Sequence, residues 1–236
     1  MTRARAARAV FGVLAAVAVA TALAQPVTAA SVAASASLYG DVPALPPSLP
    51  DKVAVVAHGA PVAGHVAIIV HNGTTRMVDD IRVTATATRP DGGLAVRAKT
   101  TLVEPPTLAP DGLAIAELVF PARGLTSETA FEFKVTNDSA KSRTTRGRLE
   151  VHDATLSRPV EGPVPQSLVV TLANPANKPV RSPIRITVMC FGEARNPAVV
   201  ATATLKKTRL PVGATMPATV NLRELCPSYL VGAHGR

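Results

Sequence analysis

The chain has 236 residues, of which 25 are Lys or Arg and 16 are Asp or Glu, so its formal net charge at pH 7 is +9. It contains no Trp, and aromatic residues make up only 3% of the sequence. Proteins bind single-stranded nucleic acid largely by stacking bases on aromatic side chains, and sugar rings are commonly held in the same way. The composition therefore counts against both ligands, and we expect no nucleic-acid partner.

Residues 1–29 are predicted to be an export signal. A basic segment precedes an apolar, Ala-rich run from Val10 to Leu23, and small residues follow, as in secretory signal peptides. The residues Val27-Thr28-Ala29 fit a signal-peptidase site, so cleavage after Ala29 is favoured, with Ala24 and Ala36 as alternatives. The basic residues of the first segment are Arg3, Arg5 and Arg8.

An uncleaved membrane anchor is the alternative to a cleaved signal. The apolar run is shorter than the ~20 residues that a spanning helix needs, and no later apolar run is long enough to cross a membrane. The mature chain is therefore expected to contain no transmembrane segment. We expect it to be secreted or held in the cell envelope.

Residues 30–51 are rich in Ala, Ser and Pro and are predicted to form a linker or an extended arm. Proline removes a backbone donor and fixes the backbone, so it disfavours both helix and central strand. The prolines of this segment are Pro43, Pro46, Pro47 and Pro50.

The first predicted domain covers residues 52–137 and is organised around residues 65–93, where two alternating strands are joined by a polar turn at Asn72-Gly73. Because successive side chains of a strand point to opposite faces, each strand is expected to turn one aliphatic row inward. About six strands separated by turn signals are typical of a β-sandwich. The expected inward rows are Val66, Ile68 and Val70, and Ile81, Val83, Ala85 and Ala87.

A second predicted domain, residues 148–236, repeats this plan after a polar, basic linker at residues 138–147. Three landmark pairs share an offset of 102 residues, and Ile81 matches Ile184 at an offset of 103, which indicates one inserted residue. The three pairs are Asn72 with Asn174, Val78 with Val180, and Leu108 with Leu210. The second inward rows are Leu168, Val170 and Leu172, and Ile184, Ile186, Val188 and Cys190. The predicted fold class is therefore all-β, with two tandem Ig-like antiparallel β-sandwich domains after an N-terminal signal peptide.

The pattern of core and turn positions in both halves resembles FxLyD-type bacterial β-sandwich domains. The first copy carries the pattern at Gly64, Val66, Val70, Asn72, Val83, Asp91-Gly92 and Leu108 to Gly112. The second copy carries it at Leu168, Asn174, Ile186 and Leu210 to Gly213. The resemblance covers most of both domains. It implies extracellular or envelope Ig-like modules, with no catalytic residues to carry over.

The two cysteines, Cys190 and Cys226, are predicted to form a structural disulfide. An exported chain meets an oxidising compartment, and Cys190 belongs to a predicted inward row. Two buried free thiols are the alternative. A catalytic dithiol is not expected, because the spacing is not C-x-x-C.

Histidines His58, His65 and His71 suggest a metal site, but their spacing argues against one. His65 and His71 share a face of one strand six residues apart, or ~20 Å at about 3.3 Å per residue, whereas the ligands of one ion must converge within a few ångströms. No G-x-S-x-G, H-E-x-x-H, phosphate-binding glycine loop or EF-hand loop occurs. We therefore expect no catalytic, cofactor or metal site, and no enzyme activity.

Positive charge is concentrated in the second half of the chain. Without Arg3, Arg5 and Arg8, 22 basic and 16 acidic residues remain, a net charge of +6. Residues 30–140 contain 8 basic and 11 acidic residues, and residues 141–236 contain 14 basic and 5 acidic ones. Such asymmetry indicates an anionic partner or attraction between the domains, and a solvated basic surface is the alternative. The candidate anion-binding residues are Lys141, Arg143, Arg146, Arg148, Lys206, Lys207 and Arg209.

The sequence thus predicts an exported, non-catalytic interaction or scaffolding protein of the cell envelope or medium. The alternative is a protein that binds anionic cell-surface polymers or lipid headgroups through its basic second domain. The partner is expected to be a protein or an anionic envelope polymer.

Overall fold

The computed structural model describes residues 38–40, 44–46, 49–90, 92–93, 96–121, 125–139, 147, 149–157, 166–193, 195–206 and 208–235. The predicted export signal, with the candidate cleavage positions Ala24, Ala29 and Ala36, lies outside these residues. So does most of the predicted linker at residues 138–147.

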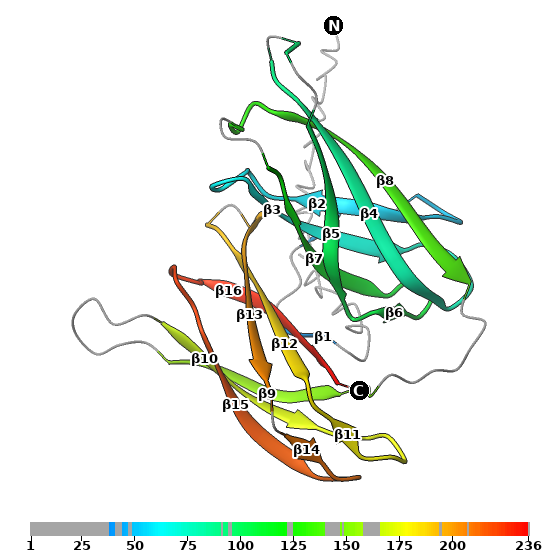
Figure 1. Ribbon diagram of the computed structural model, residues 1–236, viewed down its shortest axis with the longest axis vertical. Helices are drawn as coiled ribbons and strands as arrows, with labels where there is room; N and C mark the ends of the chain where they lie inside the picture. Colours follow the sequence, from blue (N-terminus) through cyan, green and yellow to red (C-terminus); the bar gives the residue numbers. More distant parts are fainter. Residues whose placement is uncertain are drawn as a thin grey trace, which may run out of the picture. The chain divides into compact units, whose positions relative to one another are not determined.

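The described chain is all-β and its strands pair antiparallel (Figure 1). The first strand is β1 (Leu38–Gly40). We call the next seven strands the N-terminal half and the last eight strands the C-terminal half. The N-terminal half contains β2 (Val53–His58), β3 (His65–Asn72), β4 (Val78–Thr88), β5 (Val96–Glu104), β6 (Thr107–Leu108), β7 (Leu113–Val119) and β8 (Ala130–Ser139). The C-terminal half contains β9 (Glu150–Ser157), β10 (Ser167–Ala173), β11 (Val180–Arg181), β12 (Ile184–Phe191), β13 (Pro197–Leu205), β14 (Arg209–Leu210), β15 (Thr215–Asn221) and β16 (Ser228–His234).

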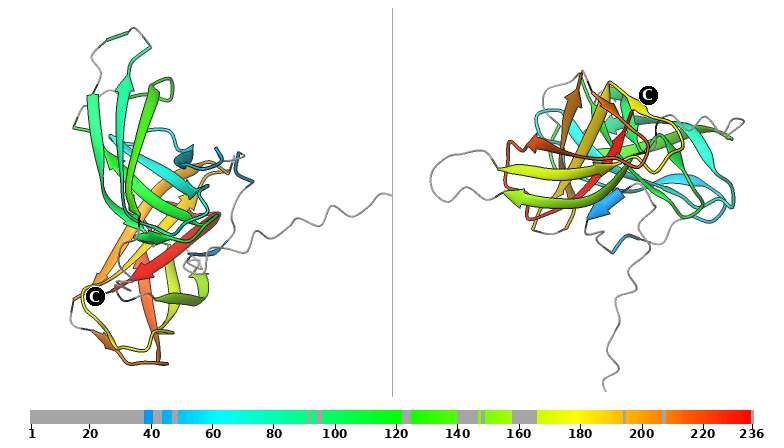
Figure 2. Two further views of the ribbon diagram at one scale, coloured as in Figure 1. Left: turned by 90° about the vertical axis from the view of Figure 1, so that its right-hand side faces the viewer. Right: turned by 90° about the horizontal axis from the view of Figure 1, so that it is seen from below.

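In the N-terminal half, the described strands form one seven-stranded sheet, and β5 joins its two parts, which we call the inner N sheet and the outer N sheet. Its first part pairs with β4 and its second part pairs with β7, and the register shifts between Thr100 and Val103. The inner N sheet contains β2, β3, β7 and the second part of β5, whereas the outer N sheet contains β4, β6, β8 and the first part of β5. The pairing of β4 with β5 and β8 can be followed in Figures 1 and 2. Both predicted inward rows are buried between these sheets, which confirms their orientation.

In the C-terminal half, the inner C sheet has the order β1-β16-β12-β13 and the outer C sheet has the order β15-β10-β9. Strands β11 and β14 form a separate two-stranded ribbon. The predicted inward rows of β10 and β12 lie in one core with residues of β15 and β16. Leu168, Val170, Leu172, Ile184 and Ile186 in these rows are all 0% exposed. The alternation of apolar and polar residues therefore predicted the core of this half correctly.

Part of the predicted linker at residues 30–51 forms a strand, β1 (Leu38–Gly40), on the edge of the inner C sheet. It pairs antiparallel with β16, with Tyr39 opposite Val231 and Leu38 opposite Gly232. The short sequence Leu-Tyr-Gly contains no proline, so all its backbone N–H groups are available for pairing with the edge of β16.

The outward face of β3 is not exposed, unlike the outward face of a half-buried strand. Ala67 and Ile69 are 2% and 0% exposed, and they lie in a third apolar cluster that joins the inner N and inner C sheets. We call this cluster the junction core. Its members are Leu38, Ala67, Ile69, Leu113, Ile115, Met189, Phe191 and Leu230. Near-continuous apolar strands such as β3 and β12 are typical of strands buried on both faces, and this signal was present in the sequence.

Candidate functional site

Two buried asparagines hold equivalent loops in the two halves. Asn72 Nδ2 donates to the carbonyl oxygens of Arg76, Leu108 and Ala109 at 2.8, 3.2 and 2.9 Å. Asn174 Nδ2 donates to the carbonyl oxygens of residues 178, 210 and 211 at 2.9, 3.1 and 3.1 Å. Every acceptor of Asn174 lies 102 residues after the corresponding acceptor of Asn72. The landmark pairs predicted from the sequence therefore share their hydrogen bonds as well as their spacing.

The strand pairs next to these asparagines also correspond. Val78 is opposite Leu108 in the β4–β6 pair, and Val180 is opposite Leu210 in the β11–β14 pair. Val180 and Leu210 are 1% and 3% exposed and belong to the core of the C-terminal half. Since these core residues point inward, the residues next to them on each strand point away from the core.

Arg181 and Arg209 occupy these outward positions, directly opposite each other on the ribbon. Opposite residues of an antiparallel pair have Cβ atoms ~4.5–5.5 Å apart on the same face. The N–H of Ser182 donates to the carbonyl oxygen of Thr208 at 2.9 Å, so residues 182 and 208 form a hydrogen-bonded pair. Arg181 and Arg209 are therefore the adjacent non-hydrogen-bonded pair, in which side chains approach more closely. Both arginines are exposed. The fold therefore places two exposed arginine residues side by side on the ribbon.

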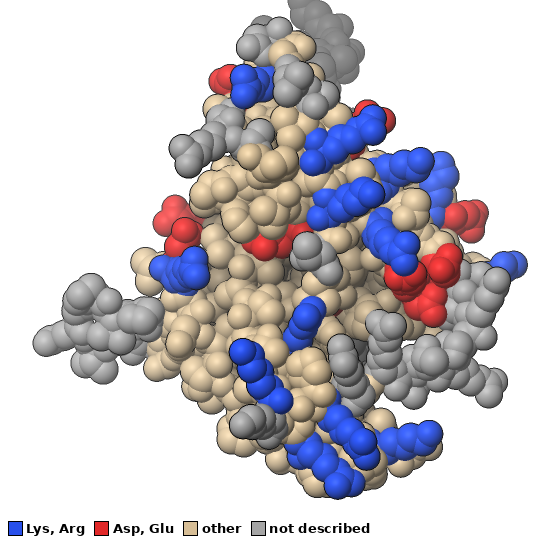
Figure 3. All heavy atoms as spheres, in the orientation of Figure 1, with Lys and Arg blue, Asp and Glu red and all other residues tan. Residues whose placement is uncertain are grey.

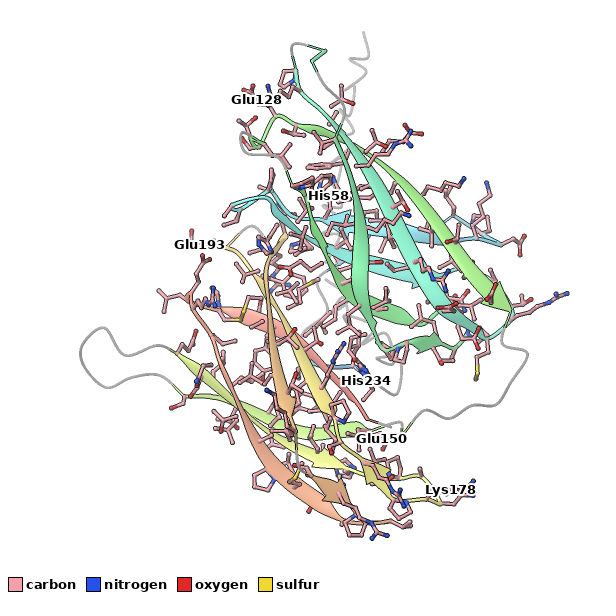
Figure 4. All side chains as sticks on the ribbon, in the orientation of Figure 1. His58, Glu128, Glu150, Lys178, Glu193 and His234 are labelled. Carbon is pink, nitrogen blue, oxygen red and sulfur yellow. A yellow bond between two sulfur atoms is a disulfide. The ribbon has the colours of Figure 1, made fainter. Side chains whose placement is uncertain are left out.

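Two lysines extend this positive surface. Lys178 lies in the turn that leads into β11 (labelled in Figure 4), and Lys206 lies between β13 and β14; both are exposed. Figure 3 shows that the lower part of this face, over β11 and β14, carries Lys and Arg side chains and no Asp or Glu among the described residues. We call Lys178, Arg181, Lys206 and Arg209 the cationic ribbon.

Among the described residues, no carboxylate forms an ion pair with a cation of the ribbon. Within the described residues, the only ion pair between an arginine and a carboxylate joins Arg82 to Asp80, in the N-terminal half. Two like charges directly opposite each other on a strand pair are unfavourable. Nothing in the described part of the chain offsets this cost at Arg181 and Arg209.

The structure brings together only part of the predicted anion-binding set. Lys206 and Arg209 lie in the cationic ribbon, whereas the other members lie outside the described residues. These other members are Lys141, Arg143, Arg146, Arg148 and Lys207. Sequence reasoning missed Lys178 and Arg181, because they are not part of a dense basic run and reach Arg209 only through the pairing of β11 with β14.

A buried carboxyl group lies where the two halves meet. Glu104, at the end of β5, is 0% exposed, and its Oε2 is hydrogen-bonded to Nδ1 of His234, the last residue of β16 (labelled in Figure 4). Burial raises the pKa of Glu104, while the hydrogen bond and charge of His234 and the charge of Arg185 act in the opposite direction. Arg185 is opposite His234 in the β12–β16 pair. Sequence reasoning missed this pair, because a glutamate at a strand end carries no local sign of burial.

The histidines that suggested a metal site lie in different environments. The ring of His58 packs against Phe131 and Phe133, with centroids 5.4 Å away in both cases. His65 Nδ1 is 3.0 Å from the carboxylate of Glu117, and His71 Nε2 is 4.0 Å from that of Asp111. Within the described ranges, no three His, Cys, Asp or Glu side chains are grouped so that they could hold a metal ion.

The disulfide between Cys190 and Cys226 is present, which confirms the prediction. It joins β12 to the segment before β16, and its Cα atoms are 5.1 Å apart. Both residues lie in the core of the C-terminal half. The N–H of Cys226 also donates to Gln166 Oε1 at 2.8 Å, which ties this segment to the start of β10.

The class of protein that these observations define is an all-β, disulfide-bonded chain with a cationic surface ribbon. No protein-family model matches the chain, and no curated protein matches it either. In the part of the chain that the structure describes, no helix has the length and hydropathy needed to cross a bilayer.

Proposed function

We propose that the chain is an exported, non-catalytic interaction or scaffolding protein of the cell envelope or medium, built from two tandem Ig-like β-sandwich domains of the FxLyD type. The observation that carries this proposal is that the buried polar side chains make contacts within the protein. Asn72 and Asn174 hold loops, and Glu104 and His234 bond to each other across the two halves. These buried side chains thus make contacts within the fold, whereas the cations of the ribbon face outward, where a partner can reach them.

The disulfide supports an extracytoplasmic location, because such bonds persist in oxidising compartments. The test is fractionation of the producing cell with the full chain carrying a C-terminal tag. We expect the tagged protein in the medium or envelope, with its N-terminus at residue 30 and no titratable thiol under denaturing, non-reducing conditions. A full-length, reduced chain in the cytoplasmic fraction would contradict the proposal.

Partner capture completes this test. Cross-linking of the mature chain on intact cells is expected to give discrete adducts, and a variant with a disrupted fold should give none. A sharp adduct that a protease removes indicates a protein partner. A disperse adduct that resists protease indicates an envelope polymer. Cross-linking that is equally strong for the unfolded variant would contradict a specific interaction role.

A second candidate function is binding of anionic cell-surface polymers or lipid headgroups through the C-terminal half. Its support is the cationic ribbon, together with the excess of 14 basic over 5 acidic residues in residues 141–236. Exposed charges act over about a Debye length, ~8 Å at physiological salt. We therefore expect retention of the mature chain on an anionic matrix at low salt and its release as the salt concentration rises. Retention that does not depend on salt would contradict this function.

A further inference from the structure

The cationic ribbon has a counterpart in the N-terminal half that carries a different charge. Val78 opposite Leu108 corresponds to Val180 opposite Leu210, and the next pair along is Asp79 opposite Thr107. At the same two positions, the C-terminal half has Arg181 and Arg209. The same backbone pairing thus accommodates an acidic and a neutral residue in one half and two arginines in the other. The fold does not require the arginines.

Ligand binding gives a reason for two arginines at a place where the fold does not need them. Like charges in directly opposite positions are unfavourable on a strand pair, and no described carboxylate pairs with either guanidinium. An anion bound between them would remove the repulsion. Each guanidinium offers several N–H donors in a planar fork that suits an oxyanion.

The arrangement of the donors favours phosphate over carboxylate. A carboxylate has two oxygens, and a single arginine can occupy both in a bidentate pair. A phosphate group within a polymer has two non-bridging oxygens in a tetrahedral rather than a planar arrangement, so each oxygen can accept from a different arginine. Lys178 and Lys206 add point charges on either side of the pair. These charges suit the neighbouring groups of a repeating polyanion.

We propose that the β11–β14 ribbon binds the phosphate groups of a polyanionic polymer, with Arg181 and Arg209 sharing one phosphate and Lys178 and Lys206 contacting its neighbours. This inference rests on the anion-binding function proposed above and assigns its site and ligand class. The apolar residues of the β11–β14 strand pair, Val180 and Leu210, are anchored in the core and so fix the position of the neighbouring arginines. Asn174 fixes the adjoining turns.

The test is binding of the mature chain to polyphosphate at low salt. The key variant is Arg181→Asp with Arg209→Thr, which installs the residues of the N-terminal counterpart. The loss of charge-assisted hydrogen bonds should weaken binding by about tenfold to a hundredfold, and the dependence on salt should become shallower. Its unfolding transition should be no lower than that of the wild type, because the counterpart positions accept these residues in the same pairing and the repulsion between the two arginines is removed.

The matched control makes the same two substitutions at exposed arginines elsewhere, Arg97→Asp with Arg223→Thr, so that the change in net charge is equal. It should change polyphosphate binding by less than about threefold, since it touches no ribbon residue. Polyglutamate of the same charge is expected to bind more weakly than polyphosphate. Equal binding of the two polymers would overturn the phosphate assignment.

Three further outcomes show whether the β11–β14 site or the anion-binding function itself is wrong. Wild-type binding that the ribbon variant leaves unchanged would overturn the site, while the anion-binding function would stand on other cations. No binding of the wild type at low salt would overturn both. If the chain is retained on vesicles that contain phosphatidylglycerol but does not bind polyphosphate, the bound phosphate belongs to a lipid headgroup. That result would overturn the proposal of a polymeric ligand.

Discussion

The carboxyl group of Glu104 is desolvated when the protein folds. It is 0% exposed, and Oε1 has no hydrogen-bond partner among the described residues. Desolvation penalises the charged form, and here it outweighs the attraction of His234 and Arg185, so the pKa of Glu104 is raised above 4.5. Proton binding to Glu104 is therefore linked to folding.

The first prediction concerns the pH dependence of stability through Glu104. With a raised folded-state pKa, the folded protein keeps a proton that the unfolded chain has already released above pH 4.5. The contribution of this group to stability is therefore fully present below pH 4.5 and is lost as the pH rises through the raised pKa. Urea unfolding from pH 4 to 8 should show the wild type losing free energy of unfolding relative to Glu104→Gln over this range.

Glu117 provides the control, because it also pairs with a histidine but is partly exposed. The carboxylate of Glu117 lies 3.0 Å from His65, and the two side chains are 29% and 48% exposed. Solvent screens such a pair, so Glu117→Gln should follow the wild-type profile. If the Glu104→Gln and wild-type profiles run parallel, burial of Glu104 does not control its protonation.

The second prediction concerns Asn174. Its replacement by Ala would leave the carbonyl oxygens of Lys178, Leu210 and Pro211 without their shared donor. Buried acceptors without partners are costly, so we expect a loss of about 2–4 kcal/mol in chemical unfolding. Binding to polyphosphate should fall as well, because the two turns that carry the cationic ribbon would no longer be tied together.

Asn177→Ala is the matched control for Asn174, since Asn177 lies exposed in the same turn. A surface substitution of this kind usually changes stability by less than about 0.5 kcal/mol. A similar loss for both variants would show that the hydrogen bonds of Asn174 are not what holds the turn.

At the scale of single elements, β1 has an effect larger than its length suggests. It has three residues, yet it covers the edge of β16 and places Leu38, 6% exposed, in the junction core. An uncovered strand edge leaves backbone groups that can pair with other chains. The segment that precedes the N-terminal half is thus built into the C-terminal half.

The third prediction follows from this placement of β1. Leu38→Ala should lower the free energy of unfolding by about 2–3 kcal/mol, in the range for large-to-small changes in a core. Hydrogen exchange of the β16 amides opposite β1 should become faster. Leu49→Ala is the control, because Leu49 is 59% exposed in the same stretch of chain. Equal effects of the two substitutions would mean that β1 is not docked.

At the scale of the whole molecule, the junction core joins the two halves of the repeat. It combines Ile69 and Ile115 of the inner N sheet with Met189, Phe191 and Leu230 of the inner C sheet. All the described strands accordingly belong to one compact unit, Val32–Arg236. Apolar surface of this kind is stable only when it is covered, so we expect the halves to unfold together.

The fourth prediction uses two adjacent residues of β3. Ile68 points into the core of the N-terminal half and Ile69 into the junction core, and both are 0% exposed. Ile68→Ala and Ile69→Ala should each cost about 2–5 kcal/mol, and calorimetry of either variant should show one transition. If Ile69→Ala is nearly neutral, or if two transitions separate, the halves are independent and the junction core does not hold them.

The sequence by itself determined the features that depend on local patterns. Alternation placed Val66, Ile68 and Val70 inward, because the two faces of a strand follow from its period of two. Cys190 was placed beside the core by the same argument, and the disulfide was predicted with it. The shared offset of Asn72 and Asn174 identified equivalent turns, and the hydrogen bond from each asparagine to the residue four positions later is local in sequence.

Only the tertiary structure decided which faces and side chains meet across long stretches of sequence. Ile69 has the position of an outward residue, and its burial depends on a partner sheet more than a hundred residues away. Glu104 meets His234 at a separation of 130 residues, and Arg181 meets Arg209 because β11 pairs with β14. Periodicity fixes the face of a strand on which a residue lies. It does not specify what will cover that face, because that choice is made by the pairing of distant strands and by the burial of whole sheets.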